Sequence, residues 1–355
     1  MNIRQEIIDS PIYNFSEHAA KVKLDQNESA YDLPKNLKEK VLQRFAQLSF
    51  NRYPQISAQS LKEDIAKLNS WPADGVVISG GSNIMIQALV TAAAINKTVL
   101  TVAPSFSLYA LQAPLQASEL IEVPLNRDFS LPLEALIKEL KRSSGTFFLA
   151  NPAAPTANLF SLDELTLLAK ASKDHWLFVI DEAYHEFSKT DFSVLIKEYP
   201  HVVSVRTFSK AYGLAGVRLG YSLSKPELAA QIQKLILPFS VSIFQIAVAE
   251  VVLKETAYMN DRLAEIYSER ERVYNALKAM SGISPYKSVT NFILFRVADA
   301  KAFYDSLLAQ GVLVRRQDHL LNLKGCLRVN IGSIEENNAF IQAAKLAAQR
   351  EFGDD

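Results

Sequence analysis

The stretch TFSKAYGLAGVRLG occupies residues 207–220 of the 355-residue chain. It places one lysine, Lys210, between the hydroxyl residues Thr207 and Ser209 on one side and Arg218, eight positions later, on the other. Short apolar segments flank the stretch, so we expect a strand on either side of the lysine. A buried lysine amine can condense with an aldehyde, and hydroxyl groups and a guanidinium can hold a phosphate beside it. The stretch therefore predicts a site for a molecule that carries both an aldehyde and a phosphate.

Pyridoxal 5′-phosphate (PLP) carries both of these groups. The stretch closely resembles the cofactor-lysine motif of the class I/II aminotransferases, in particular of their histidinol-phosphate aminotransferase branch. Further matches follow in the order of that family from about Tyr13 to Asn337, so the resemblance covers nearly the whole chain. It implies the PLP-dependent transferase fold of type I, with PLP as the cofactor.

The composition excludes several classes of protein. Apolar residues make up 49% of the chain, and 38 basic residues balance 38 acidic ones, so nothing attracts nucleic acid or an anionic membrane over a long range. No signal peptide is expected at residues 1–10, and no apolar window is long enough to span a membrane. The single cysteine, Cys326, excludes an internal disulfide and is typical of a protein in the reducing cytoplasm. We expect no metal site.

Short apolar segments alternate with helical patterns from residue 76 onward. Seven segments are predicted to be strands: 76–78, 98–103, 120–123, 146–150, 177–180, 202–207 and 217–222. Ser161 and Glu164 form a predicted capping box before a helix that runs to about Lys173. Strands alternating with helices predict an α/β fold with a mostly parallel seven-stranded sheet.

The pattern changes after Pro238. Residues 243–280 are predicted to form one long helix, and strands at 291–296 and 327–331 surround a predicted helix at 300–309. Ser333 and Glu336 form a second predicted capping box, which opens a C-terminal helix. We expect a large PLP-binding domain at residues 46–265. The resemblance implies that residues 1–45 join 266–355 in a smaller, discontinuous α+β domain.

Three residues are predicted to be catalytic. Lys210 would hold the cofactor and then transfer the proton at the substrate Cα. Asp181 ends the apolar segment 177–180, at the strand end where α/β folds bind ligands, and the resemblance pairs it with the pyridine nitrogen. Tyr184 matches the tyrosine that donates a hydrogen bond to the phenolic oxygen of the cofactor.

The remaining cofactor contacts follow from the glycine-rich turn at residues 80–83 and from the resemblance. Main-chain N–H groups where a helix begins form an anion site, so this turn is predicted to bind the phosphate together with the stretch at 207–218. Tyr109 matches the aromatic residue that covers one face of the pyridine ring. Tyr53 matches a tyrosine that reaches the PLP phosphate of the neighbouring subunit, which implies a homodimer. The cofactor-binding residues are predicted to be Gly81, Ser82, Asn83, Tyr109, Asp181, Tyr184, Thr207, Ser209, Lys210, Arg218 and Tyr53.

Arg328 matches the arginine that binds the substrate carboxylate. It lies in an apolar strand pattern, where a guanidinium requires an anionic partner or solvent. Tyr13, Asn27 and Arg315 occupy positions at which members of the family contact substrate.

The loop at residues 151–157, NPAAPTA, departs from the family pattern NPNNPTG. Alignment on Pro155 and Thr156 puts Ala154 where an asparagine usually contacts the phenolic oxygen of PLP. Alanine cannot donate that hydrogen bond, so Tyr184 would be the only side-chain donor of the pair.

These features predict a PLP-dependent aminotransferase that acts on a small-molecule amine and a 2-oxo acid. It would move an amino group between glutamate or 2-oxoglutarate and histidinol phosphate or an aromatic amino acid. One alternative keeps the fold and is a threonine-phosphate decarboxylase-like PLP enzyme. A second alternative, from another class, is a non-catalytic PLP-binding regulatory module.

Overall fold

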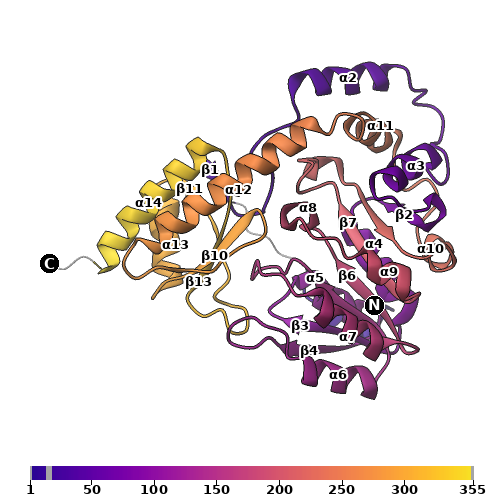
Figure 1. Ribbon diagram of the computed structural model, residues 1–355, viewed down its shortest axis with the longest axis horizontal. Helices are drawn as coiled ribbons and strands as arrows, with labels where there is room; N and C mark the ends of the chain where they lie inside the picture. The colour runs from indigo at the N-terminus through magenta and orange to yellow at the C-terminus, as the bar shows by residue number, and fades with distance from the viewer. Residues whose placement is uncertain (1, 13–17, 353–355) are drawn as a thin grey trace.

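The computed structural model describes residues 2–12 and 18–352. It contains a large body around a seven-stranded sheet and a smaller body formed mostly by the C-terminal part of the chain (Figure 1). None of the helices in these ranges is both long enough and apolar enough to cross a membrane.

The large body is built on a sheet whose strands follow the order β2-β8-β7-β6-β5-β3-β4. All neighbouring strands are parallel except β8, which is antiparallel to both β2 and β7. The strands are β2 (Val76–Ser79), β3 (Thr98–Ala103), β4 (Glu119–Pro124), β5 (Gly145–Ala150), β6 (Trp176–Asp181), β7 (Val202–Thr207) and β8 (Gly220–Leu223). The predicted fold class is therefore confirmed. The start of the last strand was wrong, because residues Ala215–Val217 form a 3₁₀ turn and Arg218 is left-handed, with φ 58°.

Helices cover both faces of this sheet, and the side chains of each strand alternate between the two faces. On β5, Phe147 packs into one apolar cluster and its neighbour Phe148 into another. The second cluster lies under α4 (Ser82–Ala93), α5 (Ser107–Leu115) and α10 (Pro226–Gln233). The helices whose buried residues join the first cluster include α3 (Gln59–Leu68), α6 (Leu133–Arg142), α7 (Leu162–Ser172), α8 (His185–Ser188) and α9 (Ser193–Glu198). A 3₁₀ turn at Ala73–Gly75 precedes β2.

The smaller body contains a four-stranded antiparallel sheet in the order β12-β13-β10-β9. Its strands are β9 (Ser284–Pro285), β10 (Phe292–Arg296), β12 (Arg315–Arg316) and β13 (Cys326–Asn330). A parallel pair, β1 (Val22–Lys23) and β11 (Val312–Leu313), ties the N-terminal segment to this body. The helices α13 (Ala300–Ala309) and α14 (Ile334–Phe352) flank the strands.

Both predicted capping boxes are present. The Ser161 hydroxyl accepts a hydrogen bond from the Glu164 N–H, and the Glu164 carboxylate accepts one from the Ser161 N–H. Ser333 and Glu336 exchange the same two bonds at the start of α14. Each pair satisfies main-chain groups that a helix start leaves without an intrahelical partner.

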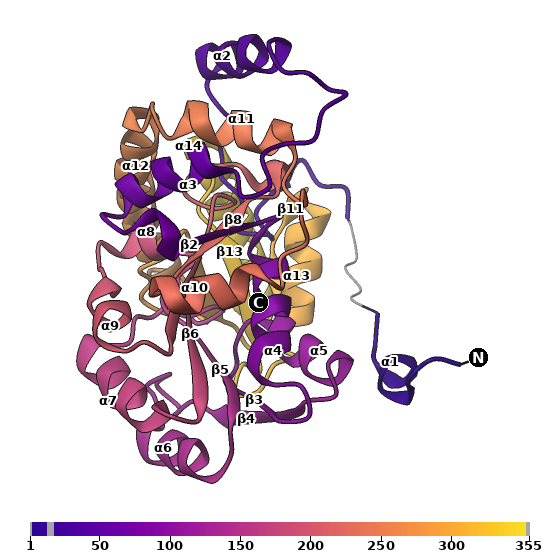
Figure 2. The same cartoon turned by 90° about the vertical axis from the view of Figure 1, so that its right-hand side faces the viewer.

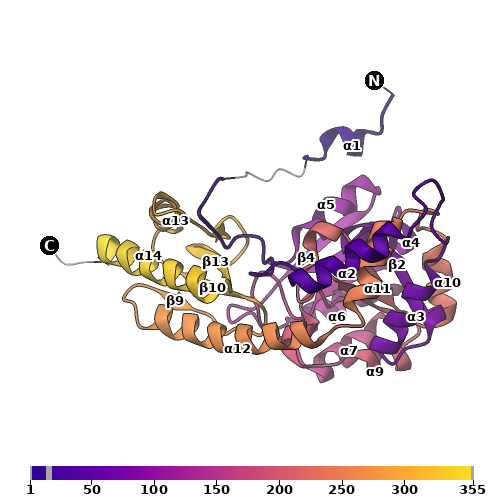
Figure 3. The same ribbon diagram turned by 90° about the horizontal axis from the view of Figure 1, so that it is seen from above.

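The helix predicted at residues 243–280 is instead two helices, α11 (Ile243–Val252) and α12 (Ala257–Lys278). Between them, the N–H groups of Lys254 and Glu255 bond to carbonyls only three residues earlier, on Val251 and Val252, which ends the α-helical ladder. Figure 3 shows α12 running beside α14 and onward to the large body.

The N-terminal segment passes between the two bodies. Val22 and Leu24 are buried in the cluster of the smaller body, whereas Leu37 and Val41 of α2 (Lys35–Ala46) are buried in the large body. The domain division at residues 46 and 265 stays a prediction. Because Leu33 already packs in the cluster of the large body, the packing favours a passage of the chain from the smaller to the large body before Leu33. The first helix, α1 (Gln5–Asp9), lies at the edge of the large body beside α5 (Figure 2). Arg4, just before it, donates to the Leu115 carbonyl of α5 at 2.6 Å.

Candidate active site

Lys210 lies in the loop after β7, at the carboxyl end of the sheet. Its Nζ donates a hydrogen bond to the main-chain oxygen of Gln26 at 2.9 Å and lies 5.9 Å from the centre of the Tyr184 ring. Burial and, second to it, the positive charge of Arg328 lower the pKa of Lys210 to about 8. The neutral amine, which is the form that attacks a carbonyl, is therefore present in about a tenth of molecules at pH 7, far more than for an ordinary lysine.

Asp181 is the last residue of β6 and is buried. Its Oδ2 accepts a hydrogen bond from the Tyr109 hydroxyl at 2.7 Å, and its Oδ1 accepts one from the Ala183 N–H at 3.1 Å. Burial raises the pKa of Asp181, and these two donors oppose that change by stabilising the carboxylate. A buried carboxylate held in this way suits a cationic N–H partner.

Tyr109 does not occupy the position predicted for it. Its side chain has 0% exposure, and its ring stacks on Phe148 with centres 4.7 Å apart and planes 10° apart. Its hydroxyl is the donor to Asp181. The ring of Phe106, at the start of the same helix, meets Tyr109 edge-on at 5.7 Å and is only partly buried. Tyr109 is therefore positioned to hold Asp181 and not to cover a ligand.

Tyr184 is buried three residues after Asp181. Its hydroxyl oxygen accepts a hydrogen bond from Asn27 Nδ2 at 2.9 Å, and its ring meets Phe292 edge-on at 5.1 Å. Burial raises the pKa of Tyr184, so the hydroxyl keeps its hydrogen at neutral pH. It can therefore donate that hydrogen to a bound molecule.

The ends of β2 and β7 meet around β8, which brings the predicted phosphate residues together. Gly220 pairs with both Ser79 and Thr207. A Cβ on Gly220 would lie 2.4 Å from the Ser82 nitrogen, and a Cβ on Gly81 would lie 3.0 Å from Arg218 Nη2. Gly81 also has φ 99°, a conformation that favours glycine. Two glycines are thus required for the close approach of the α4 start to Arg218.

The same region contains a hydroxyl network. Thr207 Oγ1 bonds Ser209 Oγ at 3.0 Å and accepts from the Ser209 N–H at 3.1 Å. Arg218 Nη1 donates to Ser209 Oγ at 3.5 Å and to the Ala215 carbonyl at 2.9 Å. Hydroxyls, a guanidinium and the first N–H groups of α4, which begins at Ser82 and Asn83, therefore form an anion cradle.

The two predicted substrate arginines are neighbours on the small sheet. Arg315 and Arg328 are paired in the register of β12 and β13. Arg328 Nη2 donates to the Asp25 main-chain oxygen at 2.8 Å, and its guanidinium carbon lies 5.3 Å from the centre of the Phe292 ring. The Phe292 ring also contacts the Tyr184 ring, so Phe292 lies between Arg328 and this predicted catalytic tyrosine.

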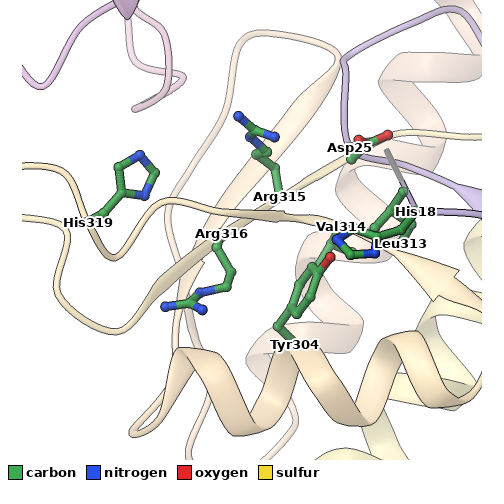
Figure 4. Close-up of a pocket in the computed structure, with 8 residues that line it drawn as sticks. All are labelled: His18, Asp25, Tyr304, Leu313, Val314, Arg315, Arg316 and His319. Carbon is green, nitrogen blue, oxygen red and sulfur yellow. The ribbon is translucent and has the colours of Figure 1, made fainter. Parts of the chain in front are cut away.

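Arg315 lines a cavity of about 290 Å³ in the smaller body (Figure 4). Arg316 donates to Asp318 at 2.7 and 3.0 Å, and burial lowers the pKa of His319. Because Arg316 is paired with Asp318 and Asp25 also lines the cavity, the wall carries charges of both signs. The lining residues are His18, Asp25, Tyr304, Leu313, Val314, Arg315, Arg316 and His319.

Residues 25–27 contact three predicted site residues in succession. The Asp25 carbonyl accepts from Arg328, the Gln26 carbonyl accepts from Lys210, and the Asn27 amide donates to Tyr184. Asn27 was predicted to contact substrate, whereas the roles of the Asp25 and Gln26 carbonyls were not foreseen. No pattern in the sequence signals them, because every amino acid carries a main-chain oxygen.

The remaining predicted residues lie apart from this group. Tyr53 is 82% exposed and stacks on Phe239 at 4.7 Å, and Tyr13 lies outside the described residues. Ala154 is half-buried against the apolar cluster that contains Tyr184.

Comparison with known proteins identifies the family. The model of the family described as aminotransferase class I and II matches residues 19–343. The chain belongs to this family. Histidinol-phosphate aminotransferase from Deinococcus radiodurans is 43% identical over 343 residues, which cover 96% of this chain and 95% of the relative. The enzyme of the same name from Thermococcus kodakarensis is 38% identical over 96% of this chain and 97% of its own length.

A solved structure supports the same fold. Histidinol-phosphate aminotransferase from Sinorhizobium meliloti, in complex with pyridoxal 5′-phosphate, superposes with a TM-score of 0.89 at 24% identity. The match covers 99% of this chain and 98% of the other. The predictions of the family, of an aminotransferase and of its fold are confirmed.

Proposed function

We propose that this aminotransferase uses pyridoxal 5′-phosphate to exchange an amino group between histidinol phosphate and 2-oxoglutarate. The observation that supports it most directly is the amine of Lys210, with a pKa lowered to about 8, in the same loop as Ser209 and Arg218 of the anion cradle. The substrate is supported by the name that the relatives from D. radiodurans and T. kodakarensis share.

The residues present fit this cofactor. A Cβ on Gly81 would crowd Arg218, and a Cβ on Gly220 would crowd the start of α4, so only glycine leaves the cradle open. The hydrogen-bond donors of the cradle suit a phosphate. Asp181 would accept the N–H of the pyridine ring, and Tyr184 would donate to the phenolic oxygen. Phe106, which is partly exposed where Tyr109 is not, would cover the ring.

When bound, the cofactor supplies an electron-withdrawing ring that makes the hydrogen on the substrate Cα acidic. The neutral Lys210 amine would take that proton from Cα and deliver it to the cofactor carbon that carries the aldehyde, and it would move a proton the opposite way in the second half-reaction. Asp181, whose carboxylate form accepts hydrogen bonds from Tyr109 and Ala183, would hold a proton on the ring nitrogen. Burial around Lys210 and Tyr184 excludes water from the amine during proton transfer.

Arg328 would bind the carboxylate of glutamate or 2-oxoglutarate, since its planar guanidinium forms two parallel hydrogen bonds with such a group. Arg315, its register partner, would contact the phosphate of histidinol phosphate. Arg328 and Arg315 would therefore offer a guanidinium to the anionic group of either substrate.

The working enzyme in this proposal is a homodimer. Tyr53 projects from an exposed apolar surface and would reach the phosphate cradle of the partner subunit. Large exposed apolar side chains on this surface suit burial against a second copy. They are Phe50, Tyr53, Ile56, Leu237, Phe239 and Phe244.

A cytoplasmic location is part of the proposal. Burial raises the pKa of Cys326 to about 11, so this thiol is unreactive. The described cysteine thus serves packing rather than a disulfide.

A half-reaction screen tests the proposed function. The purified enzyme is loaded with PLP and mixed with histidinol phosphate, glutamate, phenylalanine and threonine phosphate, and the absorbance of the bound cofactor is followed. We expect conversion to the pyridoxamine form with histidinol phosphate and glutamate, and no conversion in the Lys210→Ala variant. Conversion by phenylalanine alone would overturn the substrate assignment, and carbon dioxide release from threonine phosphate without an oxo acid would favour the decarboxylase.

A further inference from the structure

The side chain of Asn27 is enclosed in the interior of the molecule. It is 1% exposed, and its amide nitrogen lies 2.9 Å from the Tyr184 hydroxyl. Its main-chain oxygen accepts a hydrogen bond from Asn291 Nδ2 at 3.1 Å. The backbone of Asn27 is left-handed, with φ 54°, which asparagine tolerates better than most residues. Asn27 is therefore held in place on both sides and directs one N–H at one oxygen.

This N–H controls where the hydrogen of the Tyr184 hydroxyl points. A phenol has one hydrogen, and its oxygen can also accept hydrogen bonds. When Asn27 donates to the oxygen, it occupies a lone-pair direction from which the hydroxyl hydrogen is then excluded. Among the described residues no acceptor takes that hydrogen. It remains available for a bound molecule.

Tyr184 lies among the residues of the candidate active site. Lys210 Nζ is 5.9 Å from the centre of the Tyr184 ring, and Asp181 lies three residues before Tyr184. In the loop at residues 151–157, Ala153 and Ala154, which pack with the same apolar cluster, have side chains without hydrogen-bonding groups, so neither can take over as a donor. The position of this single hydrogen therefore decides whether the oxygen that it faces is stabilised as an anion.

We infer that Asn27 is a positioning residue that aims the Tyr184 hydroxyl at the phenolic oxygen of the cofactor. This inference rests on the proposed function. It replaces the prediction that Asn27 contacts substrate, because its amide nitrogen already serves Tyr184 and its side chain is enclosed. Asn27 acts on the cofactor only through the tyrosine.

The test is a pH titration of the absorbance of PLP bound to the substrate-free enzyme. A donor to the phenolic oxygen favours the deprotonated form of the bound cofactor, so loss of the donor raises the apparent pKa. Asn27→Gly keeps the left-handed backbone and removes the amide. In this variant we expect the proton-binding constant of the bound PLP to rise by about two- to tenfold, as for the loss of one hydrogen bond. Asn27→Asp, which has nearly the same size but accepts instead of donating, should shift the titration in the same direction.

Two controls separate positioning from other effects. In a Tyr184→Phe background, Asn27→Gly should cause no further change in the titration. Asn96→Gly is the matched control, because Asn96 is also left-handed, with φ 55°, but precedes β3 at the opposite end of the sheet. Its titration should equal that of the unmodified enzyme.

The outcomes distinguish this inference from the proposed function. A fall in the apparent pKa of the PLP bound to the Asn27→Gly variant would mean that the tyrosine donates to Asn27 in the native protein, and would overturn the inference. An unchanged titration with a raised KM for histidinol phosphate would also overturn it and restore a substrate contact. Failure of PLP to bind at Lys210 in the unmodified enzyme would overturn the proposed function itself.

Discussion

Lys210 and Arg328 come from different bodies of the molecule, yet the charge of one affects the proton affinity of the other. Burial is the larger cause of the lowered pKa of Lys210, and the positive charge of Arg328 is the second. Capture of the cofactor aldehyde requires the neutral amine. The capture rate should therefore rise with pH and level off above about pH 8.

The Arg328→Gln variant should shift this pH profile to higher values. It removes a positive charge that disfavours the lysine ammonium, so the pKa of Lys210 rises and less neutral amine is present at a given pH. The Arg328→Lys control keeps the charge and should keep the profile. Stopped-flow absorbance of the apoenzyme mixed with PLP measures both, and identical profiles for all three proteins would refute the coupling.

A second prediction concerns Tyr109. Tyr109→Phe removes the hydroxyl that donates to Asp181 Oδ2 and leaves the ring stacked on Phe148. The pKa of Asp181 should rise, because one of the two donors that stabilise its carboxylate is lost. We expect kcat to fall by about two- to tenfold, with the larger loss at low pH. A pH profile of kcat checks this, and the prediction fails if the variant loses affinity for PLP while kcat is preserved.

Among single residues, the sequence predicted those members of the candidate site that lie close together along the chain. Thr207, Ser209, Lys210 and Arg218 lie within twelve residues, so their spacing carried the information. The partners of Lys210 and Tyr184 are 184 and 157 positions away, and no local pattern could connect them. Tyr109 was assigned to the wrong role because sequence does not tell which of two aromatic residues on one helical turn is enclosed.

Among the structural elements, α11 links the fold to the anion cradle. Its capping box joins Ser242 and Gln245, and the Gln245 amide also donates to the Arg218 carbonyl at 2.5 Å. Arg218 is left-handed, a conformation that costs energy in a residue other than glycine and needs support from its neighbours. The start of one helix therefore stabilises the backbone of a residue in the cradle.

Two variants of the capping box separate these effects. Ser242→Ala and Gln245→Ala should each lower the free energy of unfolding by about 0.5–2 kcal/mol, because each breaks the capping box. Only Gln245→Ala should also weaken PLP binding, by about two- to tenfold, since it alone loses the bond to Arg218. Urea unfolding and fluorescence titration with PLP measure the two quantities, and equal affinities in both variants would contradict the role of Gln245.

Strands were predicted better than the ends of helices. The segments 98–103 and 202–207 coincide with β3 and β7, because continuous β-branched and apolar residues mark strands buried on both faces. The break between α11 and α12 escaped prediction, since residues 253–256 contain neither glycine nor proline. The predicted start of β8 lies too early in the chain, because apolar residues of the preceding 3₁₀ turn continue the strand pattern.

For the whole molecule, the prediction is that two chains complete each site. Tyr53→Ala and Lys210→Ala should each be nearly inactive when purified alone. A mixture of the two, unfolded and refolded together, should regain about a quarter of the native activity. Each hybrid dimer then combines Tyr53 of one chain with Lys210 of the other in one intact site, and random pairing makes half of the dimers hybrid.

Size-exclusion chromatography with light scattering should show a dimer in each of these preparations. Charge placed on the exposed apolar surface, as in Leu237→Asp, should give monomers and prevent the recovery. If the mixture stays inactive although hybrid dimers form, Tyr53 does not serve the neighbouring site.

The succession of contacts at residues 25–27 constrains how this enzyme can evolve. Two of the three contacts use carbonyl oxygens, so amino-acid type at positions 25 and 26 can drift without loss of those bonds. Chain length cannot drift in the same way: one inserted or deleted residue between Leu24 and Glu28 would misalign recognition of the anion, capture of the aldehyde and orientation of the phenol all at once. Selection on this segment therefore acts on its length, and related sequences should vary in amino-acid type at positions 25 and 26 but contain no insertions or deletions between Leu24 and Glu28.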